Sequence, residues 1–370
     1  MRLGKRPRCA SASGGGAPRQ AAAVRLGKRP RRASASGRGS LRQAAAARFG
    51  EKPAMGQKER RPGSGAGSGG PETEAGRCGP GRSGSLARIA WITDSTAYLE
   101  PAFAQEKGIH IVPLSVVFGD RSYREGEEID EATFYRLVRE SPAPPTTSQP
   151  SLGDFVALYE RLKAEYDVGI AVHLSGGISG TVETSRQAAA MVGFSVHVID
   201  SKIATYPMAF ILKAGIRLAD AGRPVEEIVR YMEDVRDRMR ALFLVRDLSY
   251  LHRGGRLNMA QYVVGSLLQV KPILHFVDGR IVPLEKVRTE KKAVARVFEL
   301  FDEAVRNVPR ARVAIIHANA PEEALRWQAR LGERYDHLDV VVSTFGPVIA
   351  THVGEGTIGF GWYPLREGEA

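Results

Sequence analysis

Cysteine is nearly absent from this chain of 370 residues, which contains only Cys9 and Cys78. Both lie in the first quarter of the sequence, so the rest can hold neither a disulfide framework nor a cysteine-based metal site. A reducing compartment suits such a chain, and we expect a cytoplasmic protein. No apolar run reaches the roughly 18 residues that a membrane-spanning helix needs. The N-terminus also lacks the apolar stretch of a secretory signal.

Acidic residues are scarce at the start of the chain. Residues 1–87 carry 19 Lys and Arg but only 4 Asp and Glu, whereas the remaining residues carry 34 basic and 37 acidic side chains. The net charge of +12 therefore belongs to the N-terminal segment. The rest of the chain offers no surface of the kind that follows phosphates, so we expect no nucleic acid partner for it.

Large apolar residues are also scarce in that segment, which contains a repeat with a period of 23 residues. Arg2–Arg8 and Arg25–Arg31 have the same sequence. A stretch this charged cannot offset the entropy of ordering, so residues 1–85 are predicted to be a disordered tail or a mis-assigned start, with Met55 as an alternative first residue. A transit peptide or a nucleic-acid-binding arm are the other interpretations.

Beyond residue 87, short apolar runs alternate with amphipathic stretches. The run Val168–Leu174 is almost continuously apolar, which is typical of a parallel strand covered on both faces. Ser151 is suited to cap a helix that continues to Ala164. This rhythm predicts a doubly wound parallel sheet over residues 86–237. The other expected elements are strands at Ile89–Thr93, Ile109–Val117 and Ser195–Ile199 and helices at Glu131–Glu140 and Val182–Met191.

The second half predicts a smaller two-layer α/β domain over residues 238–366. Asp278-Gly279 supplies the positive φ values of a tight turn, so Ile273–Pro283 is expected to form a hairpin. Apolar residues recur at helical spacing in Glu290–Val305. The other expected elements are strands at Ala241–Val245, Val313–His317 and Val340–Ser343 and helices at Tyr262–Val270 and Pro321–Arg334.

Two hydroxyl-rich loops, Thr146–Pro150 and Ser175–Thr181, are expected beyond the carboxyl ends of strands, where doubly wound sheets bind ligands. The second opens a helix, so its backbone N–H groups can face an anion, although serine and glycine are also ordinary residues before a helix. Phosphate-binding loops and metal-binding histidine patterns are missing, and Thr181 stands where a Gly-x-Ser-x-Gly elbow requires glycine. The residues themselves therefore support an α/β protein with an anion-binding hydroxyl site.

Eight short motifs in these segments resemble the DegV family and follow the family's order. The resemblance covers Leu86–Pro364 and leaves out the N-terminal tail. One such motif is weak, but eight in the right order identify the chain as a member of the family. The motifs are Thr93–Thr96, Thr147–Ser151, Leu174–Thr181, Asp200–Lys202, Leu251–Leu257, Lys271–Leu274, Glu285–Thr289 and Gly346–His352.

The resemblance implies a protein that binds one long-chain fatty acid, between C14 and C18, in an apolar tunnel between two domains. In this family hydroxyl groups hold the carboxylate, and they map onto Thr147 and Ser179, with Ser148 and Ser175 beside them. The family commonly has a second serine where this chain has Gly176, so we expect one hydroxyl fewer near the head group. No cofactor is implied.

The same resemblance implies that the chain catalyses nothing alone. In bacteria with the matching kinase, the loaded protein presents its carboxylate to an ATP-binding fatty acid kinase subunit, which forms an acyl phosphate for phospholipid synthesis. Arg256 and His352 match the residues of the kinase-facing surface, and any membrane contact is expected to be transient. The alternative is an enzyme acting on a small carboxylate or phosphate, with Ser179 or His352 catalytic, which predicts a compact polar pocket.

Overall fold

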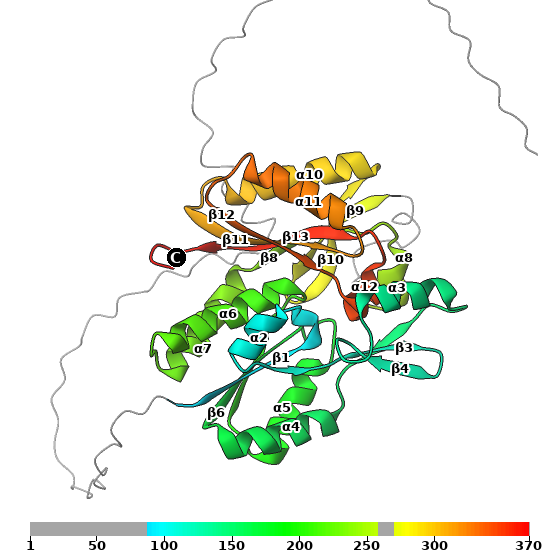
Figure 1. Cartoon of the computed structure of the whole chain (residues 1–370). Helices are drawn as coiled ribbons and strands as arrows, with labels where there is room; N and C mark the ends of the chain where they lie inside the picture. The colour runs from blue at the N-terminus through cyan, green and yellow to red at the C-terminus, as the bar shows by residue number, and fades with distance from the viewer. Residues whose placement is uncertain (1–86, 258–269, 370) are drawn as a thin grey trace, which may run out of the picture. The chain divides into compact units, whose positions relative to one another are not determined.

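The computed structural model describes residues 87–257 and 270–369 (Figure 1). The predicted disorder of residues 1–85 lies outside this part, and so does the expected helix Tyr262–Val270 apart from its last residue. The first sheet is parallel throughout, with strand order β2-β1-β6-β7. Its strands are β1 (Ile89–Asp94), β2 (His110–Val112), β6 (Val168–His173) and β7 (Val196–Asp200).

Helices cover both faces of the parallel sheet. On β1, Ala90 and Ile92 pack into a core with α4 (Leu152–Glu165) and α5 (Thr181–Val192), whereas Trp91 packs into a second core on the opposite face. Because successive side chains of a strand point to opposite faces, a strand buried on both sides is apolar over most of its length. The doubly wound fold class is thereby confirmed.

A second, antiparallel sheet of three strands adjoins the first, with order β4-β3-β5. The prediction of one strand over Ile109–Val117 is wrong, because Pro113, which has no N–H, lies between β2 and β3. The prediction of a loop at Thr146–Pro150 is also wrong, since its first three residues pair with β3. The elements here are β3 (Ser115–Phe118), β4 (Arg121–Arg124), β5 (Thr146–Ser148), the short turn η1 (Ser95–Ala97) and α3 (Glu131–Glu140).

The third sheet has six strands in the order β10-β9-β8-β13-β11-β12. Only β11 and β12 pair in parallel. Asp278 and Gly279 have φ values of 45° and 77°, which confirms the expected hairpin turn. The sequence did not reveal the central strand β13. The strands are β8 (Arg240–Leu244), β9 (Lys271–Val277), β10 (Arg280–Val287), β11 (Arg310–His317), β12 (Leu338–Thr344) and β13 (Ile358–Leu365).

One face of the six-stranded sheet packs against α10 (Glu290–Val305) and α11 (Pro321–Gly332), as Figure 1 shows. The Phe298 ring of α10 meets Trp327 of α11 at a centroid distance of 5.0 Å. The amphipathic pattern had predicted both helices, and the bounds of α10 are the expected ones.

The other face of this sheet shares a core with α6 (Tyr206–Asp220), which also packs against the parallel sheet. Ten of the fifteen residues of α6 are buried, and they include the first seven in succession, so the polar positions Lys213, Arg217 and Asp220 mark only its second half. The helix α7 (Val225–Arg238) follows and leads into β8. The expected domain boundary after residue 237 falls at this junction and stays a prediction.

Candidate ligand-binding site

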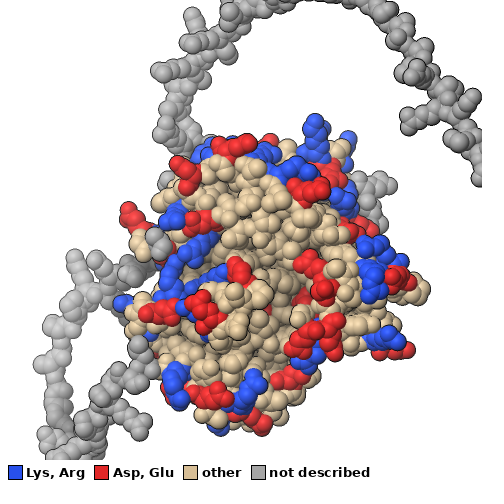
Figure 2. Space-filling view, in the orientation of Figure 1, with Lys and Arg blue, Asp and Glu red and all other residues tan. Residues whose placement is uncertain are grey.

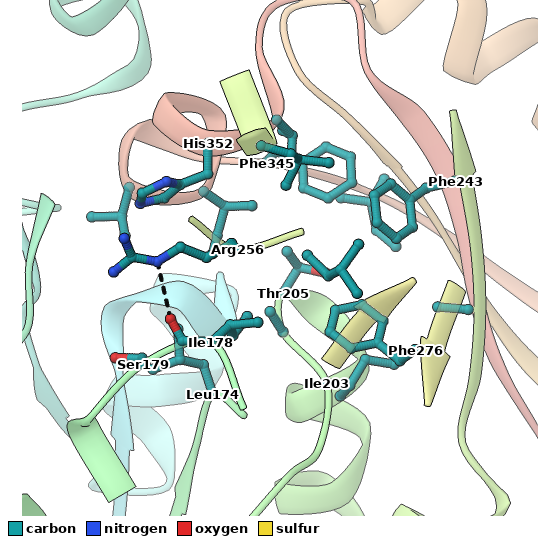
Figure 3. A pocket seen from close by; sticks show the side chains of 18 of the residues that line it. Leu174, Ile178, Ser179, Ile203, Thr205, Phe243, Arg256, Phe276, Phe345 and His352 are labelled. Atoms are coloured by element: carbon teal, nitrogen blue, oxygen red, sulfur yellow. Dashed lines mark hydrogen bonds between the residues drawn. The ribbon is translucent and has the colours of Figure 1, made fainter. Parts of the chain in front are cut away.

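A cavity of about 290 Å³ is lined by strand residues of the six-stranded sheet, by β5 of the three-stranded sheet and by loops that follow strands of the parallel sheet. Most of its walls are apolar, as Figure 3 shows around Phe243, Phe276 and Phe345. Phe243 on β8 and Phe276 on β9 form a tilted ring pair with centroids 6.1 Å apart. The other apolar lining includes Leu114, Leu174, Ile178, Ile203, Pro207, Leu251, Ile281, Ile316, Val348, Ile349 and Val353.

One end of the cavity is polar. Thr147 on β5, Ser179 in the loop before α5, and His352 on α12 (Pro347–Val353) all line it, together with Arg256. The Thr147 Oγ1 atom lies 2.8 Å from His352 Nε2, so two residues far apart in the sequence share a hydrogen bond. Figure 3 places Ser179, Arg256 and His352 on the same side of the cavity, away from the phenylalanine rings.

The environment of His352 keeps its imidazole neutral near pH 7. Burial, with a further contribution from the Arg256 guanidinium, lowers the pKa of His352 to about 4. Its Nδ1 side faces Gly254, where an added Cβ would overlap the ring. A neutral ring has one N–H, and the hydrogen bond to Thr147 therefore uses His352 Nε2 either as donor or as acceptor.

Arg256 follows α8 (Ser249–Arg253) and the glycine turn after it. Its Nε donates to the carbonyl oxygen of Ile178 at 3.2 Å, and its Nη1 donates to that of Gly254 at 2.5 Å. The first bond is drawn in Figure 3. These contacts hold the guanidinium beside the loop that carries Ser179. The family resemblance implied that Arg256 and His352 belong to a kinase-facing surface, and the structure brings both to the hydroxyl-lined end of the cavity.

The loop before α5 is held by its own side chains. Ser179 Oγ lies 2.9 Å from Thr181 Oγ1 and accepts the Thr181 N–H at 3.3 Å. Gln149, which also lines the cavity, donates from Nε2 to Thr184 Oγ1 at 2.7 Å and so joins β5 to α5. Gln149 belongs to one of the family motifs, but its role was not predicted, because nothing in the sequence indicates that it contacts Thr184.

Ser148 and Ser175 differ in their place. Ser148 lines the cavity, and its hydroxyl donates to the Gln149 carbonyl oxygen at 3.1 Å. Ser175 is fully buried, is not among the lining residues, and donates to the carbonyl oxygen of Gly279 at 2.7 Å. Gly176 is exposed, and a side chain there would point toward Asp200. A serine at position 176 would therefore add no hydroxyl to this cavity.

Three polar side chains inside the parallel-sheet domain are connected by hydrogen bonds in the order serine, histidine, aspartate, as in a catalytic triad. Ser185 Oγ lies 3.1 Å from His173 Nε2, and His173 Nδ1 lies 3.2 Å from Asp94 Oδ2. All three residues have 0% exposure, so no substrate reaches them. Asp94 also accepts the Leu174 N–H at 2.9 Å. These hydrogen-bonded side chains thus fix the start of the Ser175–Thr181 loop.

Within residues 87–257 and 270–369, no group of three or more His, Cys, Asp or Glu side chains could hold a metal ion. In the same part of the chain, no helix combines the length and the apolar character required to cross a bilayer. Basic and acidic side chains lie side by side over the face in Figure 2.

The fold and the cavity together define an α/β protein that can enclose an apolar ligand with a polar head. A family model described as "Uncharacterised protein, DegV family" matches residues 88–365. A DegV domain-containing protein of Halalkalibacterium halodurans is 49% identical over 280 residues, which make up 75% of this chain and 99% of that relative. This chain therefore belongs to the DegV family, as the ordered motifs predicted.

Solved structures of the family match over the same part of the chain. The crystal structure of Bacillus subtilis DegV, described as a fatty acid binding protein, has a TM-score of 0.71 and 44% identity and covers 75% of this chain and 100% of its own. A DegV family protein from Thermus thermophilus, described for its fatty acid binding, has a TM-score of 0.70 and 33% identity, with coverage of 75% and 100%.

Proposed function

We propose that this protein binds one long-chain fatty acid, between C14 and C18, with its carboxylate at the polar end of the cavity and its chain along the apolar walls. The observation that carries this proposal is the division of the lining into one polar end and an apolar remainder. Each buried methylene contributes about 0.8 kcal/mol, so the acyl chain of the ligand supplies most of the affinity. The alternative, an enzyme acting on a small substrate, requires a compact polar pocket. The mostly apolar lining does not favour it.

In this proposal Thr147 and Ser179 hold the carboxylate. A buried carboxylate needs hydrogen-bond donors, and if His352 donates its N–H to Thr147, the threonine O–H is free to donate to the ligand. Ser148 and Ser175 already donate to backbone carbonyl oxygens, and we assign them to shaping the loops. Neutral hydroxyls provide this contact without a salt bridge, so a carboxylate oxygen stays available as a nucleophile.

We further propose that the loaded protein presents this carboxylate to an ATP-binding kinase subunit in the cytoplasm and catalyses nothing alone. A carboxylate oxygen would attack the γ-phosphorus of ATP, ADP would leave, and the acyl phosphate would serve phospholipid synthesis. Arg256 supports this assignment because its neighbours Arg253 and Gly255 are exposed. The same turn therefore lines the cavity and reaches the surface where a partner could bind.

Two assays on each variant test the proposal: affinity for palmitate, and kinase-dependent formation of acyl phosphate. Combining Thr147→Ala with Ser179→Ala should weaken palmitate binding by far more than tenfold, because each change removes a donor to a charged group. Arg256→Ala should leave the affinity within a few-fold, since its guanidinium bonds to backbone carbonyls, and should impair acyl phosphate formation. Equal loss of affinity in both variants would contradict the separate roles.

A further inference from the structure

Glu125, which directly follows β4, is a buried carboxyl group that contacts two distant parts of the chain. It is 5% exposed. The Ser95 hydroxyl donates to its Oε2 at 2.6 Å, and the Tyr98 hydroxyl donates to its Oε1 at 3.1 Å. The same Oε1 accepts the backbone N–H of Val348 at 2.8 Å. One side chain thus ties η1 and the end of β4 to the first turn of α12.

The helix held by this contact forms one wall of the cavity. Val348, Ile349, His352 and Val353 all belong to α12 and all line the cavity. Gly346 precedes the helix so closely against Tyr98 that an added Cβ would overlap the ring. Because α12 spans only residues 347–353, a shift at its first turn would also displace His352 at its last.

We propose that Glu125 is a positioning residue for the fatty acid site: by accepting the Val348 N–H it holds α12 in place, so that His352 meets Thr147 and the helix closes the cavity. This inference rests on the proposed function, because it makes Glu125 control ligand release. Nothing in the sequence around Arg124-Glu125-Gly126-Glu127-Glu128 distinguishes Glu125 from the acidic residues of a solvated turn.

The charge of Glu125 gives this role a measurable signature. Burial raises its pKa to about 7, and the nearby Asp94 adds to the rise, whereas its three hydrogen bonds oppose it. The elements around Glu125 carry three other titratable groups, Tyr98, Glu131 and His352. Burial raises the pKa of Tyr98 well above 10, and the charge of Glu131 adds to that rise. His352 is neutral above about pH 4. Tyr98 and His352 therefore keep their charge states between pH 6 and pH 8.

The sign of the effect follows from proton linkage. In the closed form Glu125 binds its proton more tightly than it would in a form where α12 has moved and water reaches the carboxyl group. Raising the pH removes this proton and therefore favours the open form. With a pKa of about 7 when closed and its ordinary value of 4.5 when open, release should be about tenfold faster at pH 8 than at pH 6.

The test measures release of cis-parinaric acid, a fluorescent C18 fatty acid, from the full chain into excess phosphatidylcholine vesicles at pH 6 and pH 8. Glu125→Gln keeps an oxygen that can accept the Val348 N–H and carries no charge. It should release slowly at both pH values, at the rate of the wild-type protein at pH 6. Glu125→Ala lacks the acceptor and should release quickly at both. The same pH dependence in Glu125→Gln as in the wild type would overturn the proposal.

A second measurement does not depend on any ligand. The pKa of His352, followed by NMR of the imidazole, should stay near 4 in Glu125→Gln and rise toward its ordinary 6.5 in Glu125→Ala, because a displaced α12 exposes the ring. An unchanged His352 pKa in a folded Glu125→Ala variant would refute the positioning role. Wild-type protein that bound no fatty acid at all would refute the proposed function instead, and the His352 result would still decide the role of Glu125.

Discussion

Replacing Thr147 with valine tests the polar end of the cavity with the least change in shape. Valine has nearly the shape of threonine and suits the strand, where Thr147 pairs with Val116 of β3. The change removes one hydroxyl that faces the proposed carboxylate. A hydrogen bond to a charged group contributes about 1.5–3 kcal/mol, so palmitate should bind about 10- to 150-fold more weakly.

The assay is displacement of a fluorescent fatty acid by palmitate at pH 8. Thr147→Ser is the matched control, because it keeps the hydroxyl and loses only a methyl group, and it should bind within a few-fold of the wild type. Circular dichroism should show both variants folded. If Thr147→Val bound palmitate as tightly as Thr147→Ser, the carboxylate would not lie at this hydroxyl and the proposed orientation of the ligand would be wrong.

Two further predictions concern the frame around the cavity. Gly177→Ala should lower both the thermal stability and the palmitate affinity, because its Cβ would overlap the carbonyl oxygen of Gly279. Gly332→Ala, which meets open space at the end of α11, should lower neither, since alanine suits a helix better than glycine. Burial lowers the pKa of His275 to about 4, so its neutral form stabilises the fold above pH 6.5. This stability should be lost as the pH falls from 6.5 through 4, by up to about 1.4 kcal/mol per pH unit in urea titrations. A His275→Leu variant with an equally steep pH profile would contradict this cause.

Elements with a clear local signal were predictable from the sequence. In α10 one face carries Val297, Phe298 and Phe301, all buried, and this spacing alone indicates a helix. The turn at Asp278-Gly279 was predictable because few residues other than asparagine, aspartate and glycine accept positive φ in a hairpin. In both cases neighbouring residues determine the structure, so distant contacts were not needed.

Elements defined by tertiary packing escaped this reasoning. The helix α6 packs between two sheets, and its first seven residues are all buried, so the polar stripe that marks a surface helix is confined to its second half. The strand β13 was missed although it pairs with both β8 and β11. Its glycines interrupt the apolar pattern: Gly359 and Gly361 lie where a Cβ would overlap Phe243 and Pro207.

The candidate site shows the same division. The segments Thr146–Pro150 and Ser175–Thr181 were expected beyond strand ends, where ligands bind. The family resemblance singled out Thr147 and Ser179 within them, and both line one cavity. Thr147, however, lies within a strand of the antiparallel sheet rather than in a loop of the parallel one. Its bond to His352 spans 205 residues, and Glu125 contacts Val348 across 223 residues. Contacts of this range leave no trace in local sequence.

Native mass spectrometry of the full chain, purified without added lipid, tests the central claim most directly. The spectrum should contain protein heavier by the mass of one C14 to C18 fatty acid, and this extra mass should disappear on denaturation. Added palmitate should bring any unloaded protein to one fatty acid per chain. A protein that carries no lipid after purification and takes up none when palmitate is added would contradict the account.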